Sequence, residues 1–580
     1  MFHLDFEYFA FRIINMRWNI KPSPDPEKVT QLSKEINVDN SIAKLLVLRG
    51  IENYAAAKTF FRPNLTDLHN PFLMKDMDVA VRRIELAIAN NENVMIFGDY
   101  DVDGTTAVSL VYTYLKTYYK NVVSYIPDRY NEGYGVSYLG IDFASDNDIS
   151  LIIALDCGIK AIDKVAYAIT KNIDFIICDH HIPGSELPKA VAILNPKQDA
   201  CNYPYDELCG CGIGFKLIQA IGEKRNLGIE HFVPYLDLVA TAIAADIVPV
   251  TGENRTLAYF GMQVINQSPR TGIKALISQI KRPILNITDV VFTIAPRINA
   301  AGRMKSGLHA VKLLTETDFD KAKQFAVTIE KYNLDRRDLD KQITVAALQQ
   351  IKDNNEEADS TTVVFDKNWH KGVIGIVASR LIETYYRPTL VFTKSGDFLA
   401  ASARSVRGFD VYKALEACSD FMVQFGGHKY AAGLTLKPEN YQKFKTKFEE
   451  VVKNTIPKEL LIPEIRIDST VFLSDLTPKF NRIIKQFGPF GPQNMKPVFL
   501  TSALRDNGYG KTVGEDGAHL KLSIISGSDT KTYNAIGFGL GNKQDLINNG
   551  KSFDAVYTVE ENHWNGITSL QLNLKDLRGN

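Results

Sequence analysis

Acidic side chains and two histidines follow three short apolar runs in the first half of the sequence. Seven such side chains come directly after the runs 94–98, 151–155 and 174–178: Asp99, Asp101, Asp103, Asp156, Asp179, His180 and His181. Carboxylates with one or two imidazoles are a ligand set that suits Mg²⁺ or Mn²⁺. Two such ions about 4 Å apart are a common device for hydrolysing phosphodiesters. The residue types therefore predict a hydrolytic centre that holds two Mn²⁺ or Mg²⁺ ions.

The elements around these side chains must bring them together. Five near-continuous apolar runs are typical of buried parallel strands, and they lie at 94–99, 122–128, 150–156, 174–181 and 190–196. Helical patterns between them, such as 105–116 and 161–171, predict a doubly wound α/β domain. Ligands of such sheets bind beyond the carboxyl ends of the strands, so we expect the acidic side chains to converge there. Asp246, which closes an apolar helix predicted at 234–249, is a further candidate.

A capping role is the alternative for each aspartate taken alone. Asp99 by itself is better read as a helix N-cap, and Asp179 is open to the same reading or to a supporting role beside the ligands. Three acidic ends on successive strands favour the metal centre, because so many like charges cannot all stay ionised without a cation.

These residues resemble the motifs of the DHH phosphoesterase superfamily. Four segments stand in the order of its motifs: IFGDYDVDGTTA, ALDCGI, CDHH and AADIVPVTGENR. Four later segments look like the RecJ branch: PRINAAGRM, NWHKGVIGIVASRL, AASARS and FGGHKYAAG. The resemblance covers residues 60–580. It implies a single-strand-specific exonuclease that degrades DNA from the 5′ end to 5′-mononucleotides, in recombination and repair.

The resemblance also implies roles for individual residues. It makes metal ligands of Asp101, Asp103, Asp156, His180 and Asp246. Asp99 and His181 would sit at the same centre, with Asp156 as the bridge between the ions. We expect His181 to stabilise charge on the phosphate under attack.

Phosphate-handling residues form a second set of candidates. The predicted substrate-binding residues are Arg129, Arg297, Asn299, Arg303, His370, Ser402, Arg404, Gly427 and His428. Arginine presents a planar fork to phosphate oxygens, and the four arginines are expected in loops. Ser402 and Arg404 follow a predicted strand and suit a pocket for a terminal 5′-phosphate. Solvated surface arginines and ordinary turn glycines are the alternative.

The domain organisation follows from changes of pattern along the chain. We expect an N-terminal extension at 1–60, the catalytic α/β domain at 61–315, a connecting helix at 316–357, a second α/β domain at 358–456 and a small β-barrel at 457–580. The second domain resembles the DHH-associated domain, and the barrel resembles an OB-fold. Residues 479–531 carry eight Lys and Arg against four Asp and Glu, interleaved with Phe487, Phe490, Phe499 and Tyr509. That mixture is typical of single-strand binding.

Composition sets limits on the functional class. Sixty-seven Lys and Arg balance 67 Asp and Glu, which argues against coating of nucleic acid through bulk charge. The sequence contains no uncharged apolar run of about 18 residues, so no membrane span is predicted. Six cysteines make no disulfide scaffold, and Cys201, Cys209 and Cys211 lack the paired spacing of zinc sites. The first fifteen residues make a poor signal peptide, Met16 is an alternative start, and the cytoplasm is the expected compartment.

Partners and competing functions remain open at this stage. The resemblance implies single-stranded DNA with a 5′ end as substrate, a RecQ-type helicase and a single-strand-binding protein as partners, and a monomer. One alternative is a DHH phosphatase or phosphodiesterase acting on very short RNA, pAp or cyclic dinucleotides. The other is a DNA-binding relative without catalysis. We expect single-strand specificity to come from a cleft between the two α/β domains that is too narrow for a duplex.

Overall fold

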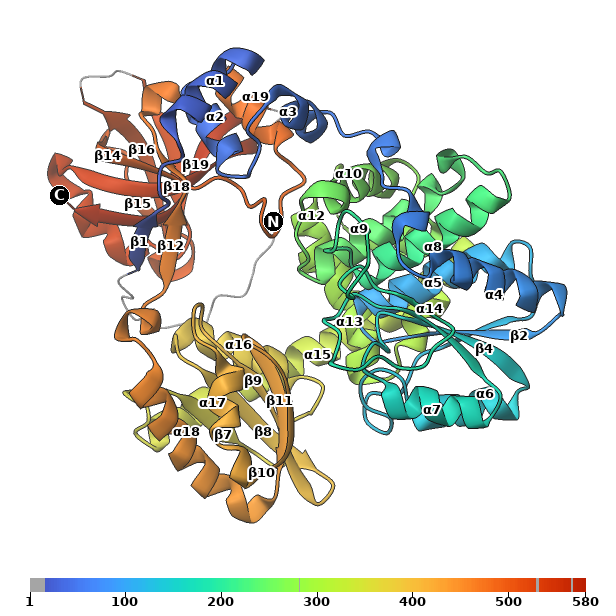
Figure 1. Ribbon diagram of the computed structural model, residues 1–580. Coiled ribbons are helices and arrows are strands. Elements are labelled where there is room, and N and C mark those ends of the chain that lie inside the picture. The colour runs from blue at the N-terminus through green and yellow to red at the C-terminus, as the bar shows by residue number, and fades with distance from the viewer. Residues whose placement is uncertain (1–15, 281, 528–530, 565–566, 580) are drawn as a thin grey trace. The chain divides into compact units, whose positions relative to one another are not determined.

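The computed structural model describes residues 16–280, 282–527, 531–564 and 567–579 (Figure 1). Contacts group the chain into two units. One contains Arg49–Leu334 and Ile483–Lys496, and the other contains the chain up to Leu48, Asp335–Arg482 and the chain from Pro497. We call the first the DHH-motif unit and the second the C-terminal unit. The prediction for the first fifteen residues lies outside the described part of the chain.

A five-stranded parallel sheet forms the centre of the DHH-motif unit. Its strands, in spatial order, are β3 (Val122–Tyr125), β2 (Asn93–Gly98), β4 (Ile149–Leu155), β5 (Asp174–Cys178) and β6 (Ala192–Leu194). All four pairings are parallel, and β2, β4, β5 and β6 are made largely of buried apolar residues, whereas the edge strand β3 is mostly part-exposed. Burial on both faces explains the continuous apolar runs in the sequence.

Helices cover both faces of this sheet (Figure 1). One face carries α4 (Met77–Ala89), α5 (Val102–Lys116) and α8 (Gly210–Lys224), and the other carries α6 (Tyr138–Asp146) and α7 (Ile162–Thr170). The alternation of the strands divides their side chains between the two faces. Ile96 and Ile153 belong to the core on the α5 side, whereas Phe97 and Ala154 belong to the core beneath α6 and α7. The doubly wound α/β prediction is confirmed.

Further helices complete this unit and lead out of it. They are α3 (Tyr54–Phe61), α9 (Leu236–Ala245), α10 (Gly252–Gln267), α11 (Thr271–Ile277), α12 (Ile287–Asp289), α13 (Ala295–Met304) and α14 (Leu308–Thr315). The predicted connecting helix is α15 (Phe319–Asp353). One wide π-type turn, Val290–Ile294, joins α12 to α13.

The C-terminal unit contains the second α/β domain. Its five-stranded sheet has the order β10 (Met422–His428), β11 (Ala431–Leu436), β9 (Phe398–Arg404), β8 (Thr389–Ser395) and β7 (Thr362–Phe365). Only β7 and β8 pair in parallel. The helices are α16 (Ile374–Thr384), α17 (Val411–Glu416) and α18 (Tyr441–Thr455). Phe444 and Phe448 of α18 pack against Phe392 in the core of the domain.

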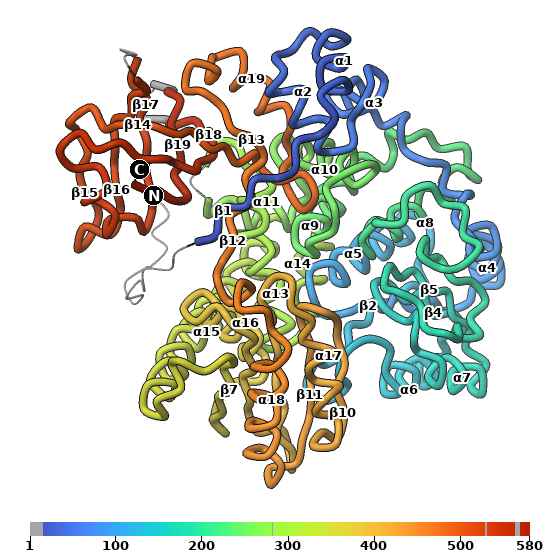
Figure 2. The backbone as a smooth tube through the Cα atoms, turned by 60° about the vertical axis from the view of Figure 1, so that its left-hand side comes forward, coloured from blue at the N-terminus to red at the C-terminus, as the bar shows by residue number. Residues whose placement is uncertain are grey.

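A seven-stranded β-structure forms the rest of the C-terminal unit. Its order is β13 (Ser469–Thr470), β14 (Phe499–Asp506), β18 (Phe553–Trp564), β19 (Ile567–Gly579), β17 (Tyr533–Gly537), β16 (His519–Ser526) and β15 (Lys511–Val513), with α19 (Pro478–Gln486) beside it. An additional pairing of β14 with β16 closes the sheet on itself, as the barrel prediction requires. The traces of these strands can be followed in Figure 2.

Two of the predicted boundaries differ from the observed units. An extension was expected at 1–60, but in its described part β1 (Arg17–Ile20) pairs in parallel with β12 (Glu464–Ile467), and Trp18 Nε1 donates to Asp576 at 2.7 Å. The helices α1 (Pro26–Ile36) and α2 (Asn40–Val47) follow in the same unit. Residues 49–60 group with the DHH-motif unit. Ile483–Lys496, expected in the barrel, groups with the DHH-motif unit instead.

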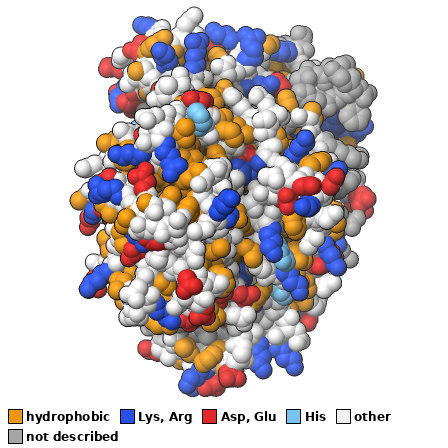
Figure 3. All heavy atoms as spheres, turned by 90° about the vertical axis from the view of Figure 1, so that its right-hand side faces the viewer, with side chains coloured by type: hydrophobic (Ala, Val, Ile, Leu, Met, Phe, Trp, Pro, Cys, Tyr) orange, Lys and Arg blue, Asp and Glu red, His pale blue; other side chains and the backbone are white. Residues whose placement is uncertain are grey.

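Surface charge is mixed, as the neutral composition suggests. On the face drawn in Figure 3, basic and acidic side chains are interspersed rather than gathered by sign. No helix in the described part of the chain is long and apolar enough to cross a bilayer.

Candidate metal centre and phosphate-binding residues

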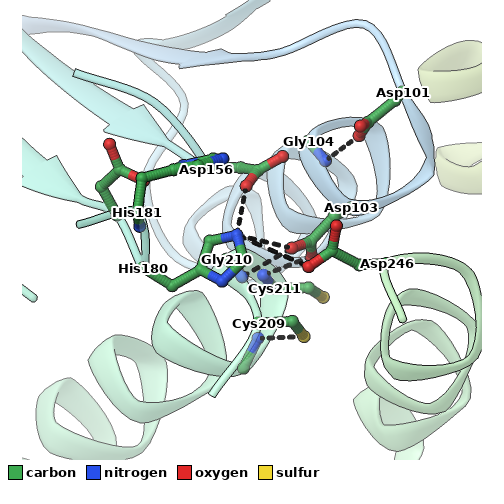
Figure 4. Close-up of polar contacts among 12 residues, drawn as sticks. Asp101, Asp103, Gly104, Asp156, His180, His181, Cys209, Gly210, Cys211 and Asp246 are labelled. Atoms are coloured by element: carbon green, nitrogen blue, oxygen red, sulfur yellow. Dashed lines mark hydrogen bonds and ion pairs between the residues drawn. The ribbon is translucent and has the colours of Figure 1, made fainter. Parts of the chain in front are cut away.

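The carboxyl ends of β2, β4 and β5 bring the predicted metal ligands together (Figure 4). Three overlapping groups have ligand atoms within 4.8 Å of one another: Asp103, His180 and Asp246; Asp99, Asp101 and Asp156; and Asp156, His180 and His181. Asp156 therefore connects the carboxylate group around Asp99 with the histidines. This arrangement has the ligand set for two neighbouring cations, with Asp156 in the shared position.

Asp103 is held rigidly by a helix that follows much later in the sequence. Its carboxylate accepts hydrogen bonds from the backbone amides of Gly210 (2.6 Å) and Cys211 (2.7 Å) in the first turn of α8. Burial, and next the negative charge of Asp101, raise the pKa of Asp103 to about 7. Gly210 is required at this contact, because a Cβ there would lie 2.6 Å from the Cβ of Asp156.

The remaining carboxylates differ in how the protein satisfies them. Asp101 is the N-cap of α5 and accepts from the amide of Gly104 at 3.1 Å, so the capping role belongs to Asp101 and not to Asp99. Asp156 has φ +60°, an unusual backbone conformation for a residue other than glycine. Burial raises the pKa values of Asp99, Asp156 and Asp246 well above their usual range, and neighbouring carboxylates raise them further.

His180 points into the centre of the carboxylates. Its Nε2 lies 3.2 Å from Asp156 Oδ1, 3.5 Å from Asp246 Oδ2 and 3.9 Å from Asp103 Oδ2. Burial lowers the pKa of His180 to about 3, so the ring is neutral at pH 7. A neutral imidazole is the form that binds a metal ion.

His181 has a different environment from its neighbour. Its Nδ1 lies 2.7 Å from Asp179 Oδ1, and its Nε2 lies 3.3 Å from the hydroxyl of Tyr134. Burial alone would lower the pKa of His181, but the hydrogen bond and the charge of Asp179 outweigh burial and raise it. Asp179 also accepts from the amide of Ile159. It thus supports His181, which was one of the two roles weighed for it from the sequence.

The centre has the properties expected of a site for divalent cations. Asp99 Oδ1, Asp156 Oδ1 and His180 Nε2 are buried and have no hydrogen-bond partner among the described residues. Buried polar atoms normally have a partner, and a cluster of buried carboxylates is unfavourable unless a positive charge compensates it. Oxygen donors with one imidazole suit Mn²⁺ or Mg²⁺. The donor set therefore fits these ions.

Arg129 and the end of helix α13, which carries Arg303, lie against the turn between β2 and α5. Gly302 packs so closely on the β2–α5 turn that a Cβ there would lie 2.3 Å from the carbonyl oxygen of Tyr100. Arg129 donates to the carbonyl of Gly302 at 3.2 Å and stacks 3.7 Å from the ring of Tyr100. Arg303, at the end of the same helix, accepts on its carbonyl from the hydroxyl of Tyr130. These contacts bring Arg129 and α13 to the turn that carries Asp99 and Asp101.

Arg297 and Asn299 also lie on α13. Arg297 forms an ion pair with Glu330 of α15 and donates to the carbonyl of Thr293, and Asn299 is half-buried. The expectation that all four arginines lie in loops was wrong for Arg297, Arg303 and Arg404, and correct for Arg129. Helix α13 carries Arg297 and Arg303, strand β9 ends at Arg404, and the neighbouring Gly302 and Gly375 serve close packing instead of turns.

The other candidates form a separate cluster in the C-terminal unit. Arg404, the last residue of β9, donates to Ser402 Oγ at 3.0 Å and to the carbonyl of Ala403 at 2.8 Å. Burial lowers the pKa of Arg404. A Cβ at Gly375 in the first turn of α16 would lie 2.9 Å from Ser402 Oγ and 3.0 Å from the Arg404 guanidinium. Gly375 therefore leaves room for both side chains at the start of a helix, where anions bind well.

Gly427, His428 and His370 complete this set. Gly427 and His428 lie at the end of β10, and in the β-sheet register His428 stands opposite Ala431, which in turn stands opposite Arg404. Gly427 has φ +144°, and a Cβ there would lie 2.4 Å from the Ala431 carbonyl oxygen, so only glycine fits. His370 Nδ1 accepts from the amide of Gly372 at 3.2 Å.

Sequence reasoning missed several residues of the metal centre. The backbone amides of Gly210 and Cys211 and the hydroxyl of Tyr134 belong to no motif recognised in the sequence. Cys209 and Cys211 are buried beside Asp103, but neither belongs to a metal-ligand group among the described residues.

Three family models match the chain. They are the DHH family N-terminal domain over residues 93–243, the DHHA1 domain over 358–454 and the RecJ OB domain over 467–576. These ranges correspond to the parallel-sheet domain, the second α/β domain and the barrel, so the predicted fold class is confirmed.

Curated proteins and solved structures match over nearly the whole chain. The single-stranded-DNA-specific exonuclease RecJ of Bacillus subtilis is 36% identical over 97% of this chain and 70% of its own length. The protein of that name from Haemophilus influenzae is 30% identical over 93% of this chain and 97% of its own length. The crystal structure of RecJ in complex with Mn²⁺ from Thermus thermophilus matches with a TM-score of 0.83 and 25% identity, over 97% of this chain and 79% of that one. On this evidence the chain belongs to the RecJ family of DHH proteins.

Proposed function

We propose that this protein is a metal-dependent exonuclease specific for single-stranded DNA. The observation that carries the proposal is the set of three overlapping ligand groups joined by Asp156 and His180. RecJ relatives bear the name of this activity, and one RecJ structure contains Mn²⁺. The reaction is hydrolysis of phosphodiester bonds.

The carboxylates and His180 would hold two Mn²⁺ or Mg²⁺ ions. One group consists of Asp103, His180 and Asp246, and the other of Asp99, Asp101 and Asp156. Two bound cations would supply a nucleophile at neutral pH and stabilise the charge of an in-line displacement at phosphorus. The amides of Gly210 and Cys211 fix Asp103 before any ion arrives, which limits the reorganisation that binding requires.

His181 would contact the phosphate under attack. Asp179 holds Nδ1, and its charge favours the protonated ring, so a proton on Nε2 is available for donation to a phosphate oxygen. Arg129, stacked on Tyr100, and Arg303, at the end of α13, would bind neighbouring phosphates. If His181 contacts the phosphate, His181→Ala should lower kcat more than it lowers Mn²⁺ affinity.

The polarity of digestion rests on the second cluster. We propose that Ser402, Arg404 and the first turn of α16 bind a terminal 5′-phosphate, which would give 5′-to-3′ digestion and 5′-mononucleotides. Gly427 and His428 of β10, two strands away from Arg404 in the sheet, and His370, which precedes α16, would contact the same nucleotide. The partly buried guanidinium and the clearance provided by Gly375 support this assignment.

A biological setting follows from the proposed activity. Processing of single strands in DNA recombination and repair, in the cytoplasm and as a monomer, is the setting we propose. A RecQ-type helicase would supply single strands, and a single-strand-binding protein would be a partner on the same DNA.

A digestion experiment tests the proposed activity. A long strand with a 5′-phosphate and a 3′ label, a blunt duplex of the same sequence and a dinucleotide would each be incubated with Mn²⁺. We expect 5′-mononucleotides to leave the single strand first, with little digestion of the duplex and none by the Asp101→Ala variant. Hydrolysis confined to the dinucleotide would support the short-substrate phosphodiesterase instead.

A further inference from the structure

The loop that follows the metal ligand Asp246 has an unfavourable backbone conformation. Ile247 has φ +62° and its side chain is 75% exposed. A β-branched residue rarely adopts this conformation, and no burial of its own side chain compensates for it. The position of Asp246 must therefore be maintained by contacts elsewhere in the loop.

Hydrogen bonds from Tyr205 and Asn254 hold the end of this loop. The buried amide of Asn254 donates to the carbonyls of Pro249 (3.0 Å) and Glu207 (2.6 Å). The hydroxyl of Tyr205 donates to the same Pro249 carbonyl at 3.3 Å. These bonds tie the end of the loop to the chain that leads into α8, the helix that also holds Asp103.

A segment from much later in the sequence also contacts the loop. The amide of Val250 donates to the carbonyl of Pro492 at 2.9 Å. Gly491 lies so close that a Cβ there would be 2.3 Å from Val250 Cγ2. Val250 is buried, and it stands four residues after Asp246.

The turn that presents Gly491 is itself fixed. Asn494 is buried and its side-chain amide donates to the carbonyls of Phe487 (2.8 Å) and Pro489 (3.0 Å). Arg49 donates to Asn494 Oδ1 at 3.0 Å. The Arg255 guanidinium donates to the Gly488 carbonyl at 2.7 Å and to the Gln486 carbonyl at 3.1 Å.

We propose that the segment 486–494 is a positioning element for Asp246. It presses on Val250 and so keeps the Asp246 carboxylate near His180 and Asp103. The proposal rests on the proposed function in one respect, which is that Asp246 binds a metal ion. It adds a role for a segment that lies within the range of the RecJ OB model yet groups with the DHH-motif unit.

A pair of complementary size changes tests this role. Gly491→Ala adds a methyl group against Val250 and should weaken Mn²⁺ binding about tenfold, a typical cost of disturbing a residue behind a metal ligand. Val250→Ala removes the methyl groups that meet position 491. The double variant should restore most of the Mn²⁺ affinity, because the added and removed atoms occupy the same space.

Mn²⁺ binding is measured by titration calorimetry without DNA, on the full chain, and thermal unfolding is followed in parallel. Gly222→Ala is the matched control, since its Cβ would be 2.2 Å from the Phe232 ring, at the far end of α8 from Asp103. It should lower thermal stability but leave Mn²⁺ affinity unchanged. With saturating Mn²⁺, Gly491→Ala should recover a kcat close to that of the unaltered protein.

The two possible failures can be told apart. Unchanged Mn²⁺ affinity in a folded Gly491→Ala protein would overturn the positioning role, as would a double variant in which the two losses simply add. If instead the unaltered protein binds no Mn²⁺, or Asp246→Ala binds it equally well, the metal assignment itself is wrong.

Discussion

The metal centre and the Ser402–Arg404 cluster contain buried charges of opposite sign, carboxylates in the first and a guanidinium in the second. In the metal centre, buried carboxylates raise one another's pKa values and leave acceptor atoms without partners. Arg404 donates to neutral oxygens, the hydroxyl of Ser402 and the carbonyl of Ala403. Desolvated charges without an opposite partner are unfavourable in the free protein. One region is therefore suited to divalent cations and the other to a phosphate group.

The carboxylate region should show the largest loss on mutation. His180→Ala removes the only imidazole that faces Asp103, Asp156 and Asp246 in the described site, and we expect Mn²⁺-dependent digestion of single strands to fall by at least about 100-fold. Asp142→Asn is the matched control, because this carboxylate pairs with Lys171 on the surface of the same unit. Digestion rates would be measured with both. Equal activity of His180→Ala and the unaltered protein would remove His180 from the centre.

The Arg404 region should show a smaller effect, limited to one end of the substrate. Arg404→Ala should lower digestion of a 5′-phosphorylated strand by about 10-fold to 100-fold, because a charge-assisted contact to phosphate is lost. Mn²⁺ affinity should not change. Arg407→Ala, at an exposed position in the following loop, is the control. If Arg404→Ala still prefers a 5′-phosphate over a 5′-hydroxyl, the second cluster does not bind the terminal phosphate.

Stability against pH should separate the two regions again. The pKa of Asp103 is raised above its usual 3.8 to about 7, so ionisation of this group removes stability from the metal-free protein as pH rises through that interval. His180, with its pKa lowered to about 3, has the opposite effect below pH 6.5 and none above. Between pH 6.5 and 8, protons therefore leave the carboxylates and Mn²⁺ should stabilise the protein increasingly.

Thermal unfolding measures this prediction. Mn²⁺ at about 100 times its dissociation constant adds about 2.7 kcal/mol to the free energy of unfolding. The gain in Tm at a fixed Mn²⁺ concentration should be larger at pH 8 than at pH 6.5, for the unaltered protein and for Arg404→Ala alike. A gain that shrinks as pH rises would contradict competition between protons and metal.

The smallest expected effect concerns Gly375. Ala is a better helix former than Gly by about 1 kcal/mol, which offsets part of the cost of the new contact, so Gly375→Ala should change thermal stability little. The same methyl group would crowd Ser402 and Arg404, and we expect the preference for a 5′-phosphate to fall a few-fold. Competition between 5′-phosphorylated and 5′-hydroxyl strands measures this preference. An unchanged preference would show that phosphate binding does not need the space that Gly375 leaves beside Ser402 and Arg404.

The sequence predicted the carboxylate region better than the Arg404 region for a physical reason. Strand ends that carry Asp99, Asp156 and His180 converge by the geometry of a parallel sheet, which the apolar runs already indicate. The arginines gave no such geometric signal. Arg297 and Arg303 proved to be helical, because the glycine of their motif serves packing against Tyr100 and not a turn.

Long-range contacts explain what the sequence did not predict. The amides that hold Asp103 come from residues more than one hundred positions later. The segment that contacts Val250 follows the second α/β domain in the sequence. The pairing of β1 with β12 is equally distant in sequence. None of these contacts leaves a local periodicity or motif, so they emerge only in the folded chain.

Counting the bound metal tests the central claim most directly. Titration of the metal-free protein with Mn²⁺ at pH 8 should give two ions per chain, and Asp156→Ala, which removes the shared ligand, should weaken both. Two tightly bound ions in Asp156→Ala, or none in the unaltered protein, would contradict the assignment of this carboxylate cluster as a two-metal centre.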